Sequence, residues 1–118
     1  MGIFSKKKPQ IDTSLEKLLK KGGFMVVTIN DLYVQFAYQK GGEHLNFEAV
    51  SHNFLPRIGQ KQEQFKSLGF ELDPKANYFK LIPVNQADIQ KLIVQLEEVF
   101  TQVYRVSFAN YDIELVLD

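Results

Sequence analysis

FMVVTINDLYVQFAYQKGGEHLNFEA, residues 24–49, is the stretch that decides the fold. It opens on a run of β-branched and apolar residues at 24–29, and two segments follow in which apolar and polar or small side chains alternate. Asn30-Asp31 and Gly41-Gly42 suit tight turns, because both pairs tolerate positive φ. The stretch therefore predicts three consecutive antiparallel strands. The apolar positions that share one face of the second and third strands are Val34, Phe36, Tyr38, Leu45, Phe47 and Ala49.

Outside this stretch, the pattern predicts three helices and two further strands. Before it, a short leucine-striped helix is expected, capped by Asp12 or Thr13 and ended by Gly22-Gly23. After it come a short helix at about 60–68, ended by Gly69, and a strand at 78–82. A long amphipathic helix is expected from Asn85 to Val103, and a half-buried strand at 111–117.

The order α-β-β-β-α-β-α-β predicts an α+β fold, a mostly antiparallel five-stranded twisted sheet flanked by three helices. A doubly wound parallel sheet is disfavoured, because three strands follow one another with turns too short for crossovers. We expect residues 1–10 to be a basic amino-terminal tail and residues 11–118 to form one α+β domain, since a chain of this length builds a single core.

Composition narrows the function classes. Fourteen basic residues balance fourteen acidic ones among 118, so nucleic acid and anionic membranes are not expected partners. There is no Cys, which excludes disulfides, thiolate zinc sites and thiol nucleophiles. No apolar run has the length of a signal peptide or a membrane span, so a cytoplasmic location is expected.

No catalytic, cofactor-binding or metal-binding set is apparent. His44 and Glu48 lie about 13 Å apart on one strand at about 3.3 Å per residue, which is too far to share an ion. Ser51 and His52, as neighbours on an extended chain, point to opposite sides. We therefore expect no enzyme and no cofactor. The alternative, a small hydrolase or transferase, would need a pocket that includes His52, Glu48 or Tyr33.

Five short segments follow one another along the chain: Tyr33-Val-Gln-Phe36, Glu48-Ala-Val-Ser-His-Asn-Phe-Leu55, Leu68-Gly-Phe70, Asn77-Tyr-Phe79 and Pro83. In this order they resemble a family of small bacterial domains grouped with type III secretion chaperones and YbjN-like peptide-binding chaperones. The resemblance covers about residues 14–106. Two positions depart from the family pattern: His52 separates a Ser-Asn pair, and Phe70 stands where Trp is common.

The resemblance implies an α+β domain, often dimeric, that holds extended segments of client proteins and performs no catalysis. Such holding uses strand edges and apolar side chains, so a chaperone-like or adaptor protein with a protein or peptide client is expected. Pairing with a second copy and an immunity or antitoxin-like role stay open. The expected peptide-binding residues are Val34, Phe36, Tyr38, Leu45 and Phe47, whose alternative role is packing in the core.

Overall fold

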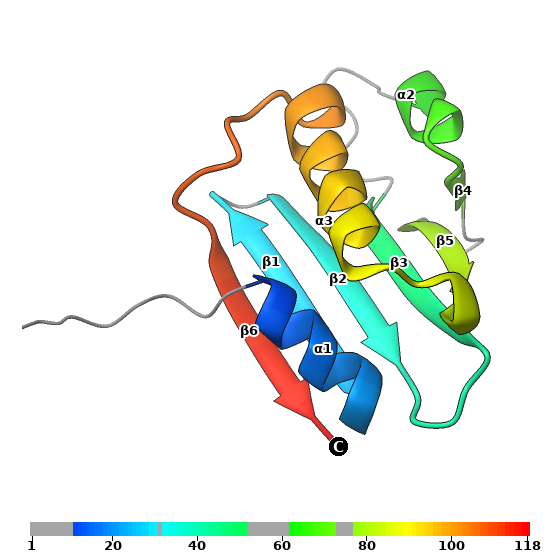
Figure 1. Ribbon diagram of the computed structural model, residues 1–118. Helices are drawn as coiled ribbons and strands as arrows, with labels where there is room; N and C mark the ends of the chain where they lie inside the picture. Colours follow the sequence, from blue (N-terminus) through cyan, green and yellow to red (C-terminus); the bar gives the residue numbers. More distant parts are fainter. Residues whose placement is uncertain (1–10, 31, 52–61, 73–76) are drawn as a thin grey trace, which may run out of the picture.

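The computed structural model describes residues 11–30, 32–51, 62–72 and 77–118 (Figure 1). The helices are α1 (Ile11–Lys21), α2 (Gln62–Ser67) and α3 (Ile89–Glu98), and the strands are β1 (Gly23–Ile29), β2 (Leu32–Tyr38), β3 (His44–Ser51), β4 (Glu71–Leu72), β5 (Asn77–Pro83) and β6 (Asp112–Leu117).

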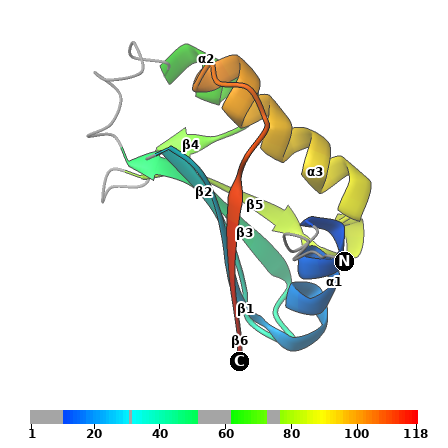
Figure 2. The same ribbon diagram turned by 90° about the vertical axis from the view of Figure 1, so that its left-hand side faces the viewer.

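The strands form one sheet in the order β4-β5-β3-β2-β1-β6, and every neighbouring pair is antiparallel. All three helices lie on the same side of this sheet, as Figure 2 shows. The predicted α+β class and the order of the longer elements are thus confirmed. The structure adds β4, a strand of two residues that is too short to give an alternating pattern.

The core lies between the sheet and the helical layer. Side chains of one parity in the central strands point into it, because successive residues of a strand face opposite sides. Met25, Val27, Val34, Phe36 and Phe47 are fully buried there. Each fully buried side chain of this size contributes about 1.5–3 kcal/mol. One hydrophobic cluster extends through the elements from Ile11 to Tyr104.

Two glycines connect α1 to the sheet. Gly22, with φ of 81°, follows the last helical residue, and its N–H donates to the carbonyl of Leu18 at 2.8 Å. Gly23 opens β1 with φ of 130°. A Cβ atom at Gly23 would lie 2.0 Å from the carbonyl oxygen of Val116. Only glycine therefore lets β6 approach β1 this closely at the end of the pair.

The helix expected from Asn85 begins later. Residues Val84–Gln86 form a short 3₁₀ turn, and α3 starts at Ile89. The carboxylate of Asp88 is its cap and accepts from the backbone N–H groups of Gln90 at 2.9 Å and Lys91 at 3.2 Å. The expectation of Asn85 as the first residue is therefore wrong.

Three further helix boundaries can be compared with the sequence prediction. α1 begins at Ile11, so Asp12 lies inside its first turn and does not precede the helix. At the end of α3 the chain continues as a π-helical turn over Val99–Val103, so the apolar stripe persists to Val103 as expected. Gly69, with φ of 90°, follows α2 in the left-handed conformation predicted for it.

None of the helices in the described ranges is both long and apolar enough to cross a bilayer.

Candidate functional site

The five residues predicted to contact a peptide are core residues. Val34, Phe36, Leu45 and Phe47 are completely buried, and Tyr38 is 8% exposed. The rings of Phe36 and Phe47 stack with centroids 4.5 Å apart, beneath the helical layer. Their parity faces the helices, so a partner cannot reach them while the domain is folded. The structure thus places all five side chains in the core, the alternative role stated for them, and the residues of the opposite parity face outward.

The opposite parity lines the sheet face that no described helix covers (Figure 2). Directly paired residues build a row across five strands, since partners in antiparallel strands project to the same side. Leu81 is 53% exposed and Val116 is 40% exposed, one near each end of the row. In order from β6 to β5 the row is Val116, Phe24, Ala37, Asn46 and Leu81.

A second row runs beside the first. Its ends and its centre carry carboxylates, while Val26 and Phe79 add partly buried apolar surface between them. In order from β6 to β4 this row is Glu114, Val26, Gln35, Glu48, Phe79 and Glu71. The uncovered face therefore combines a mainly apolar row with a flanking row that is rich in acidic groups.

Asn46 is the one polar residue in the apolar row. Its Nδ2 donates to Oε2 of Glu48 at 2.7 Å, which fixes the amide against the neighbouring row. Its Oδ1 is buried and accepts no hydrogen bond within the described part of the chain. An unsatisfied buried acceptor costs about 1–3 kcal/mol. The centre of the uncovered face thus carries an acceptor whose hydrogen bond is unmade.

Charge is unevenly divided between the two sides of the domain. On the uncovered face, the described strands place the carboxylates of Glu48, Glu71, Asp112 and Glu114, and no Lys or Arg from those strands accompanies them. His44 stands at one end, opposite Pro83. Lysines are found instead in the helical layer: Lys17, Lys20, Lys21, Lys66 and Lys91. The described strands therefore make the uncovered face acidic, although the chain as a whole is neutral.

Tyr33 and Glu48 meet on this face. Glu48 pairs with Gln35, so Tyr33 two residues away is its diagonal neighbour. Burial raises the pKa of the Tyr33 phenol above its ordinary value of 10.0, and the negative charge of Glu48 raises this pKa further. The phenol therefore stays protonated near neutral pH and is a poor base or nucleophile there.

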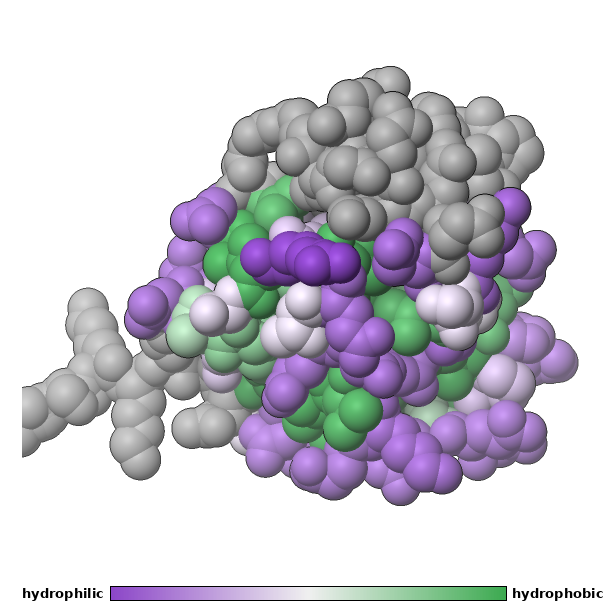
Figure 3. Space-filling model, turned by 90° about the horizontal axis from the view of Figure 1, so that it is seen from above, coloured by the Kyte–Doolittle hydropathy of each residue, from purple (hydrophilic) through white to green (hydrophobic). Residues whose placement is uncertain are grey.

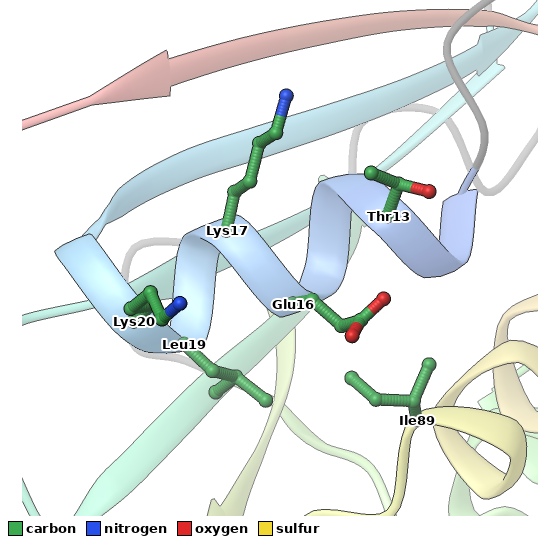
Figure 4. A pocket seen from close by; sticks show the side chains of 6 residues that line it. All are labelled: Thr13, Glu16, Lys17, Leu19, Lys20 and Ile89. Atoms are coloured by element: carbon green, nitrogen blue, oxygen red, sulfur yellow. The ribbon is translucent and has the colours of Figure 1, made fainter.

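The surface between α1 and α3 carries a separate hollow of about 540 Å³ (Figure 4). In Figure 4, Glu16 and Leu19 point toward Ile89 of α3, whereas Lys17 points away from it. The charged groups here all belong to α1, and the hydroxyl of Thr13 makes only a long bond of 3.4 Å, to Oδ1 of its neighbour Asp12. The lining of the hollow is Thr13, Glu16, Lys17, Leu19, Lys20 and Ile89.

A larger hollow of about 770 Å³ lies between β5 and α3. Lys80 reaches across it, and its Nζ donates to Oε1 of Gln95 and to the carbonyl of Leu68, both at 2.7 Å. Burial lowers the pKa of Lys80, and the opposing attraction of Glu98 raises it by less. These two bonds join the sheet to α2 and α3, which is a structural role.

The described residues contain few other groups that could bind a metal or take part in catalysis. Within them no three His, Asp or Glu side chains gather as a metal site would require. His44 lines a shallow hollow of about 370 Å³ with Glu43 and residues 83–85. His52, which the enzyme alternative invoked, lies outside the described residues, so only Tyr33 and Glu48 of that set are brought together.

At the end of the domain where β6 begins, seen in Figure 3, apolar surface occurs as several patches separated by hydrophilic side chains. This end of the domain therefore shows no continuous apolar surface in that view. The sequence did hold a signal for the rows on the sheet, since residues 24–29 are apolar at both parities. Such a run is typical of a strand with apolar surroundings on both faces.

Comparison of the chain with protein-family models, with curated proteins and with solved structures finds no match. The resemblance to type III secretion chaperones and YbjN-like proteins consequently stays a prediction.

Proposed function

We propose that this chain is a non-enzymatic protein-binding module, chaperone-like or adaptor-like, that holds a polypeptide client against the uncovered face of its sheet. The observation that carries the proposal is the apolar row in which Leu81 and Val116 remain 53% and 40% exposed. Grouped apolar side chains on one face of a small domain are typical of interaction sites.

Burial of the row would drive association. Covering apolar surface is worth about 25 cal/mol per Å², and Leu81, Phe24 and Val116 are the largest apolar side chains of the row. Asn46 gives the row one polar position, and its amide is held there by the bond of 2.7 Å from Nδ2 to Glu48. An apolar contact surface with one defined polar position fits a polypeptide better than a small metabolite, because the face is not a closed cavity.

The family resemblance supports a client held in extended form, and the composition supports a cytoplasmic setting for it. A hydrolase or transferase would need converging groups with pKa values moved toward neutrality. Tyr33, the phenol on this face, has its pKa moved away from neutrality. Burial lowers the pKa of Lys80, but its Nζ is bonded to Gln95 and to the carbonyl of Leu68. We therefore favour the binding role over the enzyme alternative.

The test uses two matched variants. Leu81→Ser removes an exposed apolar side chain from the uncovered face, and Val94→Ser removes one of similar exposure, 56%, from α3. A client is first captured with the unaltered protein and identified by mass spectrometry, and its affinity for each purified variant is then measured. We expect Leu81→Ser to weaken binding about tenfold and Val94→Ser to leave it unchanged. Equal affinities for both variants would contradict the proposal.

A further inference from the structure

β6 is an edge strand over its whole length. It pairs with β1 on one side along six residues, and no strand of the described ranges pairs with its other side (Figure 1). The opposite edge of the sheet is formed by β4, which has only two residues. An edge strand with unpaired backbone groups is a template for another extended chain.

The ladder fixes which backbone groups point outward. The N–H of Asp118 donates to the carbonyl of Gly22 at 3.0 Å, so this pair is hydrogen-bonded. Hydrogen-bonded and non-hydrogen-bonded pairs alternate along antiparallel strands. The N–H and C=O groups of Ile113, Leu115 and Leu117 therefore point away from β1, toward the open side.

Side chains on β6 alternate in character. Ile113, Leu115 and Leu117 are half-buried and lie on the helical side, next to α1. On the uncovered side, the exposed residues are Asp112, Glu114 and Val116. A strand added to this edge would place one set of side chains beside aliphatic residues and the other set beside two carboxylates and a valine.

We infer that the open edge of β6 binds an extended segment of another protein as an antiparallel strand, and this rests on the proposed function. The segment carries Lys or Arg opposite Asp112 and Glu114. It carries apolar residues opposite Val116 and at the intervening positions, opposite Ile113 and Leu115. Oppositely charged cross-strand pairs are favourable, whereas like charges directly opposite are destabilising. Strand addition supplies main-chain hydrogen bonds for affinity and side-chain alternation for specificity.

A second copy of the chain does not satisfy this charge pattern. For two β6 strands to pair antiparallel through their open edges, residues of the same parity must face each other. Two such registers overlap by four or more residues of β6: one puts Glu114 directly opposite itself, and the other puts Asp112 opposite Asp118, just beyond the end of the strand. The partner is therefore a basic segment of another protein and not this chain's own β6.

The test uses the full-length protein and a designed peptide, Thr-Ile-Phe-Val-Lys-Val-Lys-Thr, with blocked ends. Its lysines fall opposite Glu114 and Asp112 when its phenylalanine is opposite Val116. Binding is followed by amide chemical shifts. We expect the largest shifts at Ile113, Leu115 and Leu117. The double variant D112N/E114Q should bind about threefold to tenfold more weakly, since two exposed cross-strand ion pairs are lost.

Two control peptides separate the contributions. Replacement of both lysines by glutamate should abolish binding, and N-methylation of both valines should do so without any change in charge, because their N–H groups face β6. Equal binding of the glutamate peptide, or a dimer of the protein in sedimentation, would overturn the inference. Shifts confined to Leu81, Ala37 and Phe24 would also overturn it, while leaving face binding intact. Loss of face binding is seen separately, in the Leu81→Ser variant.

Discussion

The hydroxyl of Tyr104 donates a hydrogen bond of 2.8 Å to the backbone carbonyl of Tyr33, 71 positions earlier in the chain. Tyr104 follows the π-helical turn and is 4% exposed, whereas Tyr33 lies near the start of β2 with its side chain on the uncovered face. The bond thus joins the helical layer to a strand that carries the proposed binding surface.

Replacement of Tyr104 by Phe should destabilise the domain. The carbonyl of Tyr33 loses its donor, so we expect the free energy of unfolding to fall by about 1–2 kcal/mol. Urea unfolding measures this. Tyr38→Phe is the control, since the Tyr38 hydroxyl makes a longer and local bond of 3.2 Å to the carbonyl of Gly42. If the free energy of unfolding falls no more in Tyr104→Phe than in Tyr38→Phe, the bond from Tyr104 to Tyr33 does not have the stabilising role described here.

Gly23→Ala should loosen β6. The added Cβ would meet the carbonyl of Val116 at 2.0 Å, at a φ of 130°. We expect the free energy of unfolding to fall by at least about 2 kcal/mol and amide hydrogen exchange in β6 to become faster. Gly41→Ala is the matched control, because Gly41 also has positive φ but a Cβ there meets nothing within 4 Å. That change should cost about 1 kcal/mol and leave exchange in β6 unaltered.

Glu48→Gln should lower the pKa of Tyr33, because the negative charge that disfavours the phenolate is removed. Ultraviolet titration of the tyrosines, with Tyr33→Phe used to assign the signal, measures the change. Burial remains the larger cause, so the pKa should stay above 10.0 after the substitution. An unchanged Tyr33 titration in Glu48→Gln would show that the two groups do not face each other.

The same shift predicts how stability depends on pH. A phenol whose pKa is raised in the folded state favours the protonated form there, so its contribution is complete below the unfolded value of 10.0. Above that pH the unfolded chain releases the proton first, and stability falls as pH rises toward the folded pKa. Tyr33→Phe should therefore lose less stability between pH 9 and pH 11 than the unaltered protein.

Asn46→Val should stabilise the domain. The substitution removes a buried acceptor that has no partner among the described residues and places a β-branched side chain in a strand. Once the lost hydrogen bond to Glu48 is subtracted, we expect the free energy of unfolding to rise by about 0.5–1 kcal/mol. Gln35→Val, on the same face, serves as the control for the strand preference alone. A destabilised Asn46→Val protein would contradict this description of the acceptor.

Much of the fold follows from local patterns in the sequence. Alternation at Val34, Phe36 and Tyr38 places these residues on one side of β2, and the structure bears this out. Alternation does not say which side meets the helices, because residues 24–29 are apolar at both parities. The side is decided by α1 and α3, whose buried residues Leu18 and Leu96 cover one face only. The five predicted contact residues therefore fell on the covered face.

Where an element begins or ends depends on contacts with residues that are distant in the sequence. Asn85 and Asp88 are both good caps by type, but the N–H of Val84 donates to the carbonyl of Glu43 at 2.8 Å and so prolongs the β3 ladder. The helix consequently starts beyond that point, at the second cap. The alternation of apolar and polar residues in β6 likewise does not predict that β6 lies at the edge of the sheet, since this depends on which strand lies beside β1.

The most direct measurement is methyl chemical-shift mapping of the protein with a captured client. We expect shifts for the methyl groups of Leu81, Val116 and Val26 on the uncovered face, and none for Val34 or Leu45 beyond small secondary effects. Shifts concentrated instead at Leu19 and Ile89, in the hollow between α1 and α3, would show that the client binds the helical side, and the proposed site would be wrong.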